Sequence, residues 1–314
     1  MNNKIIKTIK LLRPKQWIKN FAIFAAIVFT GELFDPPVFF RVLVGFFVFC
    51  GLSSAIYIVN DIFDVEKDRL HPFKKFRPLA NKDLSIRYAV VLAAILATSS
   101  LILSTYVAPA FLVLVLVYLI LQVLYSMSLK DIEILDILTL AAGYILRVYA
   151  GETASGYHIS VWLVLTTVAL SLFIAVGKRR SELTLISHIQ NINKDAVRKT
   201  LSHYSERLLD VYASIFATAT FISYSYFTFL ENPQGIKIGI SFFMPDFLPA
   251  TFQRKWLMIT ILPVVYGLMR YLQDIYEKHE GESPEKVLLS DIPLLAAVIM
   301  WALLVVFIIY VIGG

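Results

Sequence analysis

The sequence predicts an all-α, polytopic membrane protein, and its composition and the spacing of its apolar runs carry this prediction. Of the 314 residues, 58% are hydrophobic and 17% are charged, and the mean hydropathy is +0.71. A typical soluble domain is less apolar and carries about 25% charged residues. A helix that crosses a bilayer needs roughly 20 mostly apolar residues. Runs of this length recur along the chain, so we expect a bundle of transmembrane helices.

Nine apolar runs are long enough to be spans, and each is bounded by charged residues, Pro or Gly. No soluble region, flexible linker or low-complexity tract separates them in the sequence, so we expect a single transmembrane domain over residues 1–314. The expected spans are 17–34, 38–59, 88–108, 110–127, 132–150, 161–176, 208–230, 256–272 and 292–312.

The distribution of Lys and Arg predicts the orientation. If the N-terminus is cytoplasmic and the nine spans alternate, 24 of the 29 Lys and Arg residues lie in cytoplasmic segments and four lie outside. Cytoplasmic loops carry such an excess of cations. We therefore expect a multi-pass protein of the inner (cytoplasmic) cell membrane, with its active face toward the cytoplasm. Cations beside anionic lipid also explain the net charge of +6, so we expect the lipid bilayer as a partner and no nucleic acid.

The stretch NDIFDVEKDRLHPFKKFRP, residues 60–78, directly follows the second apolar run. Asp61, Asp64 and Asp68 are spaced i, i+3 and i+7, which places them on one face if the helix continues. Three unpaired carboxylates repel one another, and a divalent cation removes this penalty. Carboxylate oxygens suit Mg²⁺, which shares its remaining positions with water and phosphate oxygens. The pattern predicts a diphosphate site with Mg²⁺; the alternative is a solvated helix end balanced by Lys67 and Arg69.

Two further groups of ionisable residues are candidates for the site. The cations His71, Lys74, Lys75 and Arg77 follow the acids and either bind phosphate oxygens or face lipid headgroups. Asp136 and Arg147 lie within the fifth run, where buried charge is costly and a functional or paired role is the default. Eleven residues of helix separate them by about 16 Å, so we do not expect them to pair with each other. We expect Asp136 to lie at the active cavity and Arg147 to have a structural partner on another helix.

The motif N-D-x-x-D-x-x-x-D at 60–68, followed by YSMSLK at 125–130 and nine expected spans, resembles the UbiA-type intramembrane prenyltransferase superfamily over essentially the whole chain. The resemblance implies a UbiA-like helical bundle and Mg²⁺ held by aspartate-rich motifs after the second and sixth helices. The first motif is complete. At the second position the chain has AVGKRRSEL, with Lys178, Arg179, Arg180 and Glu182, and cations favour direct binding of phosphate over a second metal site.

This variant is similar to the decaprenyl-phosphate phosphoribosyltransferase branch of the superfamily, a branch associated with cell wall biogenesis. The matching stretches are RPKQWIKN at 13–20, the acidic stretch at 60–80, YSMSLKDIEILDI at 125–137, LRVYAG at 146–151, GKRRSEL at 177–183 and GESPEKVLLSD at 281–291. The branch implies a transferase whose donor is 5-phosphoribosyl 1-diphosphate and whose acceptor is a polyprenyl (decaprenyl) phosphate.

The resemblance also implies roles for individual residues. Asp61, Asp64 and Asp68, with Asn60, are expected to hold Mg²⁺ on the diphosphate leaving group, and Lys130, Lys178 and Arg179 to orient the acceptor phosphate or the 5-phosphate of the donor. No strong general base is needed, because the acceptor phosphate is already anionic near pH 7. The remaining candidates follow from the residues and keep two interpretations each. Lys19 and Asn20 border the cavity mouth or belong to an interfacial anchor around Trp17, and Lys74 and Arg77 bind phosphate or face lipid. Tyr125 shares the phosphate with Lys130 or is an interfacial tyrosine, and Glu182 orients Lys178 or forms a surface ion pair.

Three other functions stay open at this point. A prenyltransferase that moves a polyprenyl group to an aromatic or other small acceptor shares the fold and the metal, but it would need the second acidic motif, which this chain lacks. A transporter or channel usually binds its ion near the bilayer midplane, whereas these acids lie at one surface. An inactive scaffold would not need the complete first motif. The sequence does not fix the length of the acceptor or whether a homo-oligomer forms.

Overall fold

The computed structural model describes residues 2–70, 74–188, 199–231, 256–277 and 284–312, and within these ranges the chain is helical and contains no strand. The elements before the acidic stretch and through it are α1 (Asn2–Leu12), the 3₁₀ helix η1 (Pro14–Phe24), α2 (Ala25–Phe29), α3 (Pro36–Phe63), α4 (Val65–Leu70) and η2 (Lys74–Phe76). The middle of the chain forms α5 (Ile86–Val107), α6 (Pro109–Met127), η3 (Leu129–Asp131), α7 (Leu135–Ser155) and α8 (Val161–His188). The rest forms η5 (Lys199–His203), α9 (Glu206–Leu230), η7 (Trp256–Thr260), α11 (Ile261–Glu277), α12 (Pro284–Ser290), α13 (Ile292–Phe307) and the π-helical η8 (Ile308–Ile312).

Seven helices among the described residues are long and apolar enough to cross a membrane, and they coincide with seven of the nine expected spans. The prediction of nine is therefore approximate. The first expected span is divided between η1 and α2. The fifth is the continuous helix α7, but Asp136, Arg147 and Glu152 lower its hydropathy. The chain is a multi-pass membrane protein.

Local sequence signals set the helix starts. Four helices begin at an Asp or Ser whose side chain accepts a hydrogen bond from the amide three residues later, which satisfies a donor that the first helical turn leaves free. These N-caps are Asp35, Ser85, Ser205 and Asp291. The sequence therefore sets where these four helices begin.

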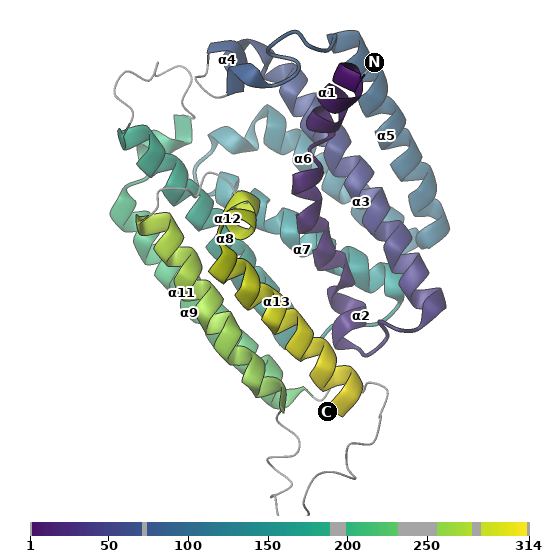
Figure 1. The fold of residues 1–314 in the computed structure, drawn as a ribbon, viewed down its shortest axis with the longest axis vertical. Helices are drawn as coiled ribbons and strands as arrows, with labels where there is room; N and C mark the ends of the chain where they lie inside the picture. Colours follow the sequence, from purple (N-terminus) through teal and green to yellow (C-terminus); the bar gives the residue numbers. More distant parts are fainter. Residues whose placement is uncertain (1, 71–73, 189–198, 232–255, 278–283, 313–314) are drawn as a thin grey trace, which may run out of the picture.

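The helices pack as one bundle around α3 and α8. Figure 1 shows α1 and α4 at the upper end and the C-terminus at the lower end. α3 packs against α5, α7 and η1, and α8 packs against α7, α9 and α11. Each of these two groups encloses its own apolar core: one around Phe49 and Phe111, the other around Phe173 and Tyr271. α7 contacts both α3 and α8, so it joins the two halves.

A glycine allows α7 to touch η1 directly. A Cβ atom placed on Gly151 would lie 1.9 Å from the carbonyl oxygen of Ile23, far inside the van der Waals limit. The atom it meets belongs to the backbone, so no change of rotamer can relieve the overlap. Gly151 therefore fixes the distance between α7 and the 3₁₀ segment that carries Lys19 and Asn20.

Substituting Gly151 tests this contact. We expect Gly151→Ala to lower the free energy of unfolding by about 3 kcal/mol, at the upper end of the cost of overpacking, because backbone must move. Thermal unfolding of the purified protein in detergent measures the change. Gly267→Ala in α11 is the matched control, since its Cβ would meet only Leu294 Cδ1 at 3.9 Å. Equal midpoints for the two variants would contradict the prediction.

Candidate active site

The first feature of the site is a pair of buried carboxylates that converge on one cation. Asp61, in the last turn of α3, is 2% exposed and forms ion pairs with Arg13 at 2.5 Å and with Arg77 at 3.1 Å. Asp68, on α4, contacts the same Nη1 atom of Arg77 at 2.6 Å. Arg77 thus occupies the point at which the two carboxylates meet.

The third acid, Asp64, faces a different partner. α3 ends at Phe63, and Asp64 is its C-terminal cap with φ −94° and ψ 4°, so α4 starts in a new direction. The predicted single helical face is therefore wrong: the break separates Asp64 from the other two acids. Its carboxylate lies 3.4 Å from the ammonium of Lys130 on η3. This contact brings the acidic stretch next to the YSMSLK segment.

The carboxylates of Asp61 and Asp68 fit a divalent cation as ligands, even though no group of three metal-ligating side chains is gathered among the described residues. Asp61 and Asp68 already converge on a positive charge, and carboxylate oxygens are ligands that Mg²⁺ prefers. Burial raises the pKa of Asp68 above its ordinary value, and the Arg77 guanidinium offsets only part of that effect. Two carboxylates and water would leave positions for phosphate oxygens.

The other predicted members of this group lie around the acids. Asn60 is half-buried one residue before Asp61. Lys74, on η2, is half-buried and lies within electrostatic reach of Asp68. Lys75 is exposed, and its ammonium lies 5.2 Å from the ring centroid of Phe76. His71 lies outside the described residues.

A second group of charges encloses Arg179, which is fully buried on α8. Its guanidinium contacts Asp136 at 2.6 Å, Glu182 at 2.5 Å and the hydroxyl of Tyr125 at 2.9 Å. Asp136 also accepts a hydrogen bond from Tyr204 at 2.8 Å. Asp136 and Arg179 are both 0% exposed, so in this conformation neither lines an open surface. The arrangement ties α6, α7 and α8 together.

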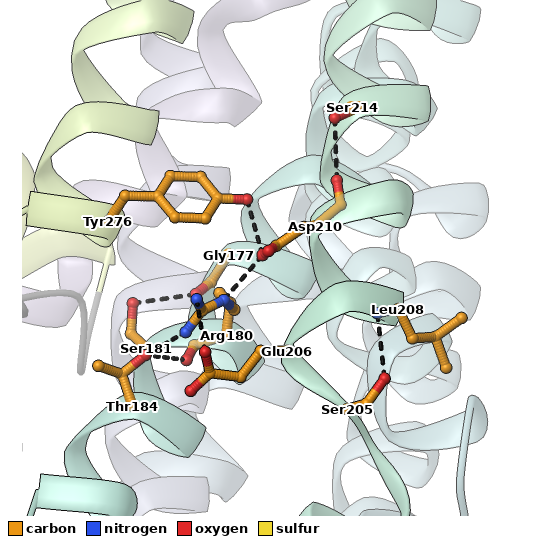
Figure 2. A network of polar contacts seen from close by, with 10 residues as sticks. All are labelled: Gly177, Arg180, Ser181, Thr184, Ser205, Glu206, Leu208, Asp210, Ser214 and Tyr276. Atoms are coloured by element: carbon orange, nitrogen blue, oxygen red, sulfur yellow. Dashed lines mark hydrogen bonds and ion pairs between the residues drawn. The ribbon is translucent and has the colours of Figure 1, made fainter.

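The neighbouring residue Arg180 fastens α8 to two more helices. Figure 2 shows its guanidinium donating to Asp210 at 2.8 Å and to Glu206 at 3.0 Å, both on α9. The same oxygen of Asp210 accepts from the hydroxyl of Tyr276 on α11 at 2.8 Å. The cations predicted from GKRRSEL therefore differ in environment: Arg179 and Arg180 are held by acids, whereas Lys178 is half-buried between them and α12.

A third group joins the N-terminal segment to α12. Lys19 on η1 forms an ion pair with Glu285 at 2.9 Å and donates to Gln16 at 2.6 Å. Gln16 in turn donates to Glu285 and accepts from the hydroxyl of Tyr57 at 3.1 Å. Sequence reasoning placed Lys19 and the nearby Gln16 at the cavity mouth but did not single out Glu285 or Arg13. Both stretches that contain these residues matched the family, yet nothing in the spacing shows that positions 16 and 285 meet.

Asn20 and Arg147 form a separate structural contact. Arg147 donates to Asn20 at 2.7 Å, to the hydroxyl of Tyr118 at 2.7 Å and to the carbonyl of Gly143 at 2.5 Å. The prediction that Arg147 has a partner outside its own helix is confirmed. The pair sits deeper along α7 than Asp136 and satisfies a charge that lies within the bundle.

Comparisons with known proteins identify the family and the fold of this chain. The curated decaprenyl-phosphate phosphoribosyltransferases of Mycolicibacterium smegmatis and Corynebacterium glutamicum are 33% and 34% identical over 95% and 96% of this chain, covering 91% and 86% of their own lengths. A solved structure of a UbiA homolog from Archaeoglobus fulgidus bound to GPP and Mg²⁺ superposes with a TM-score of 0.69 at 19% identity, over 95% of this chain and 96% of that one. Another structure of the Archaeoglobus fulgidus homolog, bound to Cd²⁺, gives 0.63 at 17% identity, over 96% of this chain and 99% of that one. The profile of the UbiA prenyltransferase family matches residues 20–290, and the chain belongs to that family.

Proposed function

We propose that this protein is a phosphoribosyltransferase of the membrane, which moves 5-phosphoribose from 5-phosphoribosyl 1-diphosphate to a polyprenyl phosphate and releases diphosphate. The observation that carries the proposal is the charge of α8. Where a second metal-binding acidic motif would be needed, α8 carries Lys178, Arg179 and Arg180. Arg179 and Arg180 are paired with acids, so Lys178 is the cation of this segment that we assign to phosphate. The name that the curated relatives share supports the same donor and acceptor.

The residues at the leaving-group side are Asp61 and Asp68, which would hold Mg²⁺ with help from Asp64 and Asn60. The metal, when bound, would neutralise charge on the diphosphate as the bond to C1 of the ribose breaks. Arg13 and Arg77 already contact these carboxylates. When the donor binds, the two guanidiniums are placed to move onto its phosphate oxygens, because Arg binds phosphate with two parallel hydrogen bonds.

On the acceptor side, an anionic phosphate oxygen of the lipid would form the new bond to C1, and the electron pair of the broken bond would leave with diphosphate. Two anionic substrates must approach each other, so cations are needed between them. Lys130 and Lys178 are the candidates, since Lys130 reaches Asp64 and Lys178 is half-buried next to Arg179 on α8. The distribution of cations supports a cytoplasmic N-terminus in the inner membrane, with the donor entering from the cytoplasm and the lipid from the bilayer.

A transfer assay tests the proposal. Purified protein in detergent is mixed with Mg²⁺, polyprenyl phosphate and the donor labelled in its ribose, and label in the lipid fraction is measured. We expect transfer only with Mg²⁺ present. Turnover of an allylic diphosphate onto an aromatic acid, with none from the ribose donor, would instead identify a prenyltransferase.

Lys178→Ala is the first variant for this assay. We expect the rate of single-turnover transfer to fall about 100-fold, the size of the loss when one preorganised charge is removed from a developing anionic centre. Lys286→Ala, on the exposed face of α12, is the control and should transfer at the wild-type rate. Equal rates for the two variants would exclude Lys178 from phosphate binding.

A further inference from the structure

Glu285 is a buried carboxylate that the transfer chemistry described above does not use. It lies at the start of α12, and its side chain is 5% exposed. Burial alone would raise its pKa, but Lys19 and Lys178 lower the pKa below its ordinary value, so the group stays ionised at neutral pH. An ionised carboxylate only accepts hydrogen bonds, and its two oxygens have about four lone-pair sites. Lys19 and Gln16 leave part of that capacity unused.

A buried hydroxyl without a partner lies beside this carboxylate. Tyr271, on α11, is 7% exposed, and its hydroxyl forms no hydrogen bond with any residue in the described part of the chain. It lies within electrostatic reach of Glu285 and of the phenol of Tyr144 on α7. A buried polar group that is left unpaired costs roughly 1–3 kcal/mol. Such a group is retained at that cost when a ligand or water supplies the missing hydrogen bond.

Tyr271 packs closely against a glycine of α8. A Cβ atom on Gly177 would lie 3.1 Å from the Tyr271 hydroxyl and 2.9 Å from its ring. The hydroxyl therefore lies against the backbone of α8, directly before Lys178. The polar group is therefore adjacent to a cation that we assign to the acceptor or donor phosphate.

The carboxylate is also connected to the diphosphate side of the site. Tyr57 precedes Asp61 by four residues on α3, so it lies one turn, about 6 Å, further along the helix. The guanidinium of Arg13, which binds Asp61, lies 5.2 Å from the ring centroid of Tyr57. The Tyr57 hydroxyl reaches Glu285 through Gln16. The side chains of Arg13, Tyr57 and Gln16 therefore link the Asp61 carboxylate to Glu285.

We propose that Glu285 and the Tyr271 hydroxyl recognise the vicinal hydroxyl groups of the pentose ring of the donor, which makes them the residues that select ribose. The inference rests on the proposed function. A diol presents two donors, which match a carboxylate that only accepts, and the Tyr271 hydroxyl can either donate or accept. A phosphate group would be repelled by Glu285, so the carboxylate favours the uncharged part of the donor.

The test compares two donors: 5-phosphoribosyl 1-diphosphate and its 2-deoxy analogue, each with polyprenyl phosphate as the acceptor. A site that hydrogen-bonds a hydroxyl rejects the analogue that lacks it strongly, because its own polar groups are then left unpaired. We expect wild-type kcat/KM to favour the ribose donor by about 100-fold or more. In Glu285→Gln this ratio should fall to about 10 or less, with most of the loss on the ribose donor.

Two further variants separate recognition from a structural role. Tyr271→Phe removes only a hydroxyl that has no described partner, so the fold is retained, and the preference for ribose should fall about tenfold, as expected for loss of one hydrogen bond. Tyr266→Phe, on the exposed side of the same helix, should leave the preference unchanged. The inference would be overturned if Glu285→Gln and Tyr271→Phe each lowered kcat/KM by the same factor for both donors. Glu285 and Tyr271 would then have a structural role.

The outcomes for the wild-type protein are equally distinct. Transfer from both donors at similar kcat/KM would overturn the inference while leaving the proposed function intact. Absence of transfer from the ribose donor, together with turnover of another diphosphate, would overturn the proposed function and the inference with it.

Discussion

Asp61→Asn should lower the rate of transfer by about 1,000-fold, the largest loss of activity that we expect from one substitution. The amide has the size of the carboxylate but no charge. It removes one of the two carboxylates that meet at Arg77, and it leaves Arg13 without its anionic partner. A divalent cation would then be held by Asp68 and Asp64, which the helix break directs apart. Single-turnover transfer measured over a range of Mg²⁺ concentrations should show a residual rate that extra metal does not restore.

The fold should survive this change, because Arg77 keeps Asp68 at 2.6 Å. Asp83→Asn is the matched control: Asp83 also pairs with a cation, Lys7 at 2.7 Å, but on the surface of the protein. Diphosphate with Mg²⁺ should raise the thermal unfolding midpoint of the wild type and of Asp83→Asn, and leave that of Asp61→Asn unchanged. Retention of the shift in Asp61→Asn would show that the cation is held elsewhere.

Arg179→Met should cause the largest loss of stability, about 3–5 kcal/mol in the free energy of unfolding, as is typical when one partner of a buried ion pair is removed. Asp136 is fully buried, and without Arg179 its carboxylate would keep only neutral partners, among them Tyr204 and the amide of Ile137. Denaturant or thermal unfolding in detergent measures the difference. Arg87→Met, at an exposed position in the first turn of α5, should change stability little.

The double variant Asp136→Leu/Arg179→Met gives this prediction a sharper form. Replacing both members of a buried ion pair by apolar residues is often nearly neutral, so the double variant should be more stable than Arg179→Met alone. The losses of stability in Asp136→Leu and in Arg179→Met should not simply add in the double variant. If they did add, Asp136 and Arg179 would not depend on each other, contrary to their 2.6 Å contact.

Much of the fold follows from composition, because the bilayer requires long apolar helices whose ends are marked by charge, Pro or a capping residue. Seven expected spans match helices of the structure, six of them within a few residues, while α8 continues well beyond the expected end at residue 176. The two others differ for physical reasons. The 3₁₀ segment η1 and the short α2 together replace one regular helix, and α7 contains charges that are paired inside the bundle. Hydropathy cannot distinguish a charge with a buried partner from one exposed to lipid.

The candidate site was predictable only where its residues are neighbours in sequence. Asp61, Asp64 and Asp68 were found by their spacing, although the break at Asp64 was not. Contacts between distant segments give no such signal: Arg13 with Asp61, Lys130 with Asp64 and Arg179 with Asp136 each join different elements. Arg179 shows the limit most clearly, since a cation next to Lys178 in sequence points into the protein and is neutralised there.

The pairing of the first and last parts of the chain has a consequence for biosynthesis. Lys19 meets Glu285 across 266 positions of sequence, and Tyr310 in η8 donates its hydroxyl hydrogen bond to Ile27 at 2.8 Å. Helices enter a membrane in the order in which the ribosome makes them. The N-terminal segment therefore lacks these partners until α12 and η8 have been synthesised. Glu285 and Tyr271 come together with Lys19 only after α12 has been synthesised, so a nascent chain that lacks α12 cannot hold the sugar of its donor there.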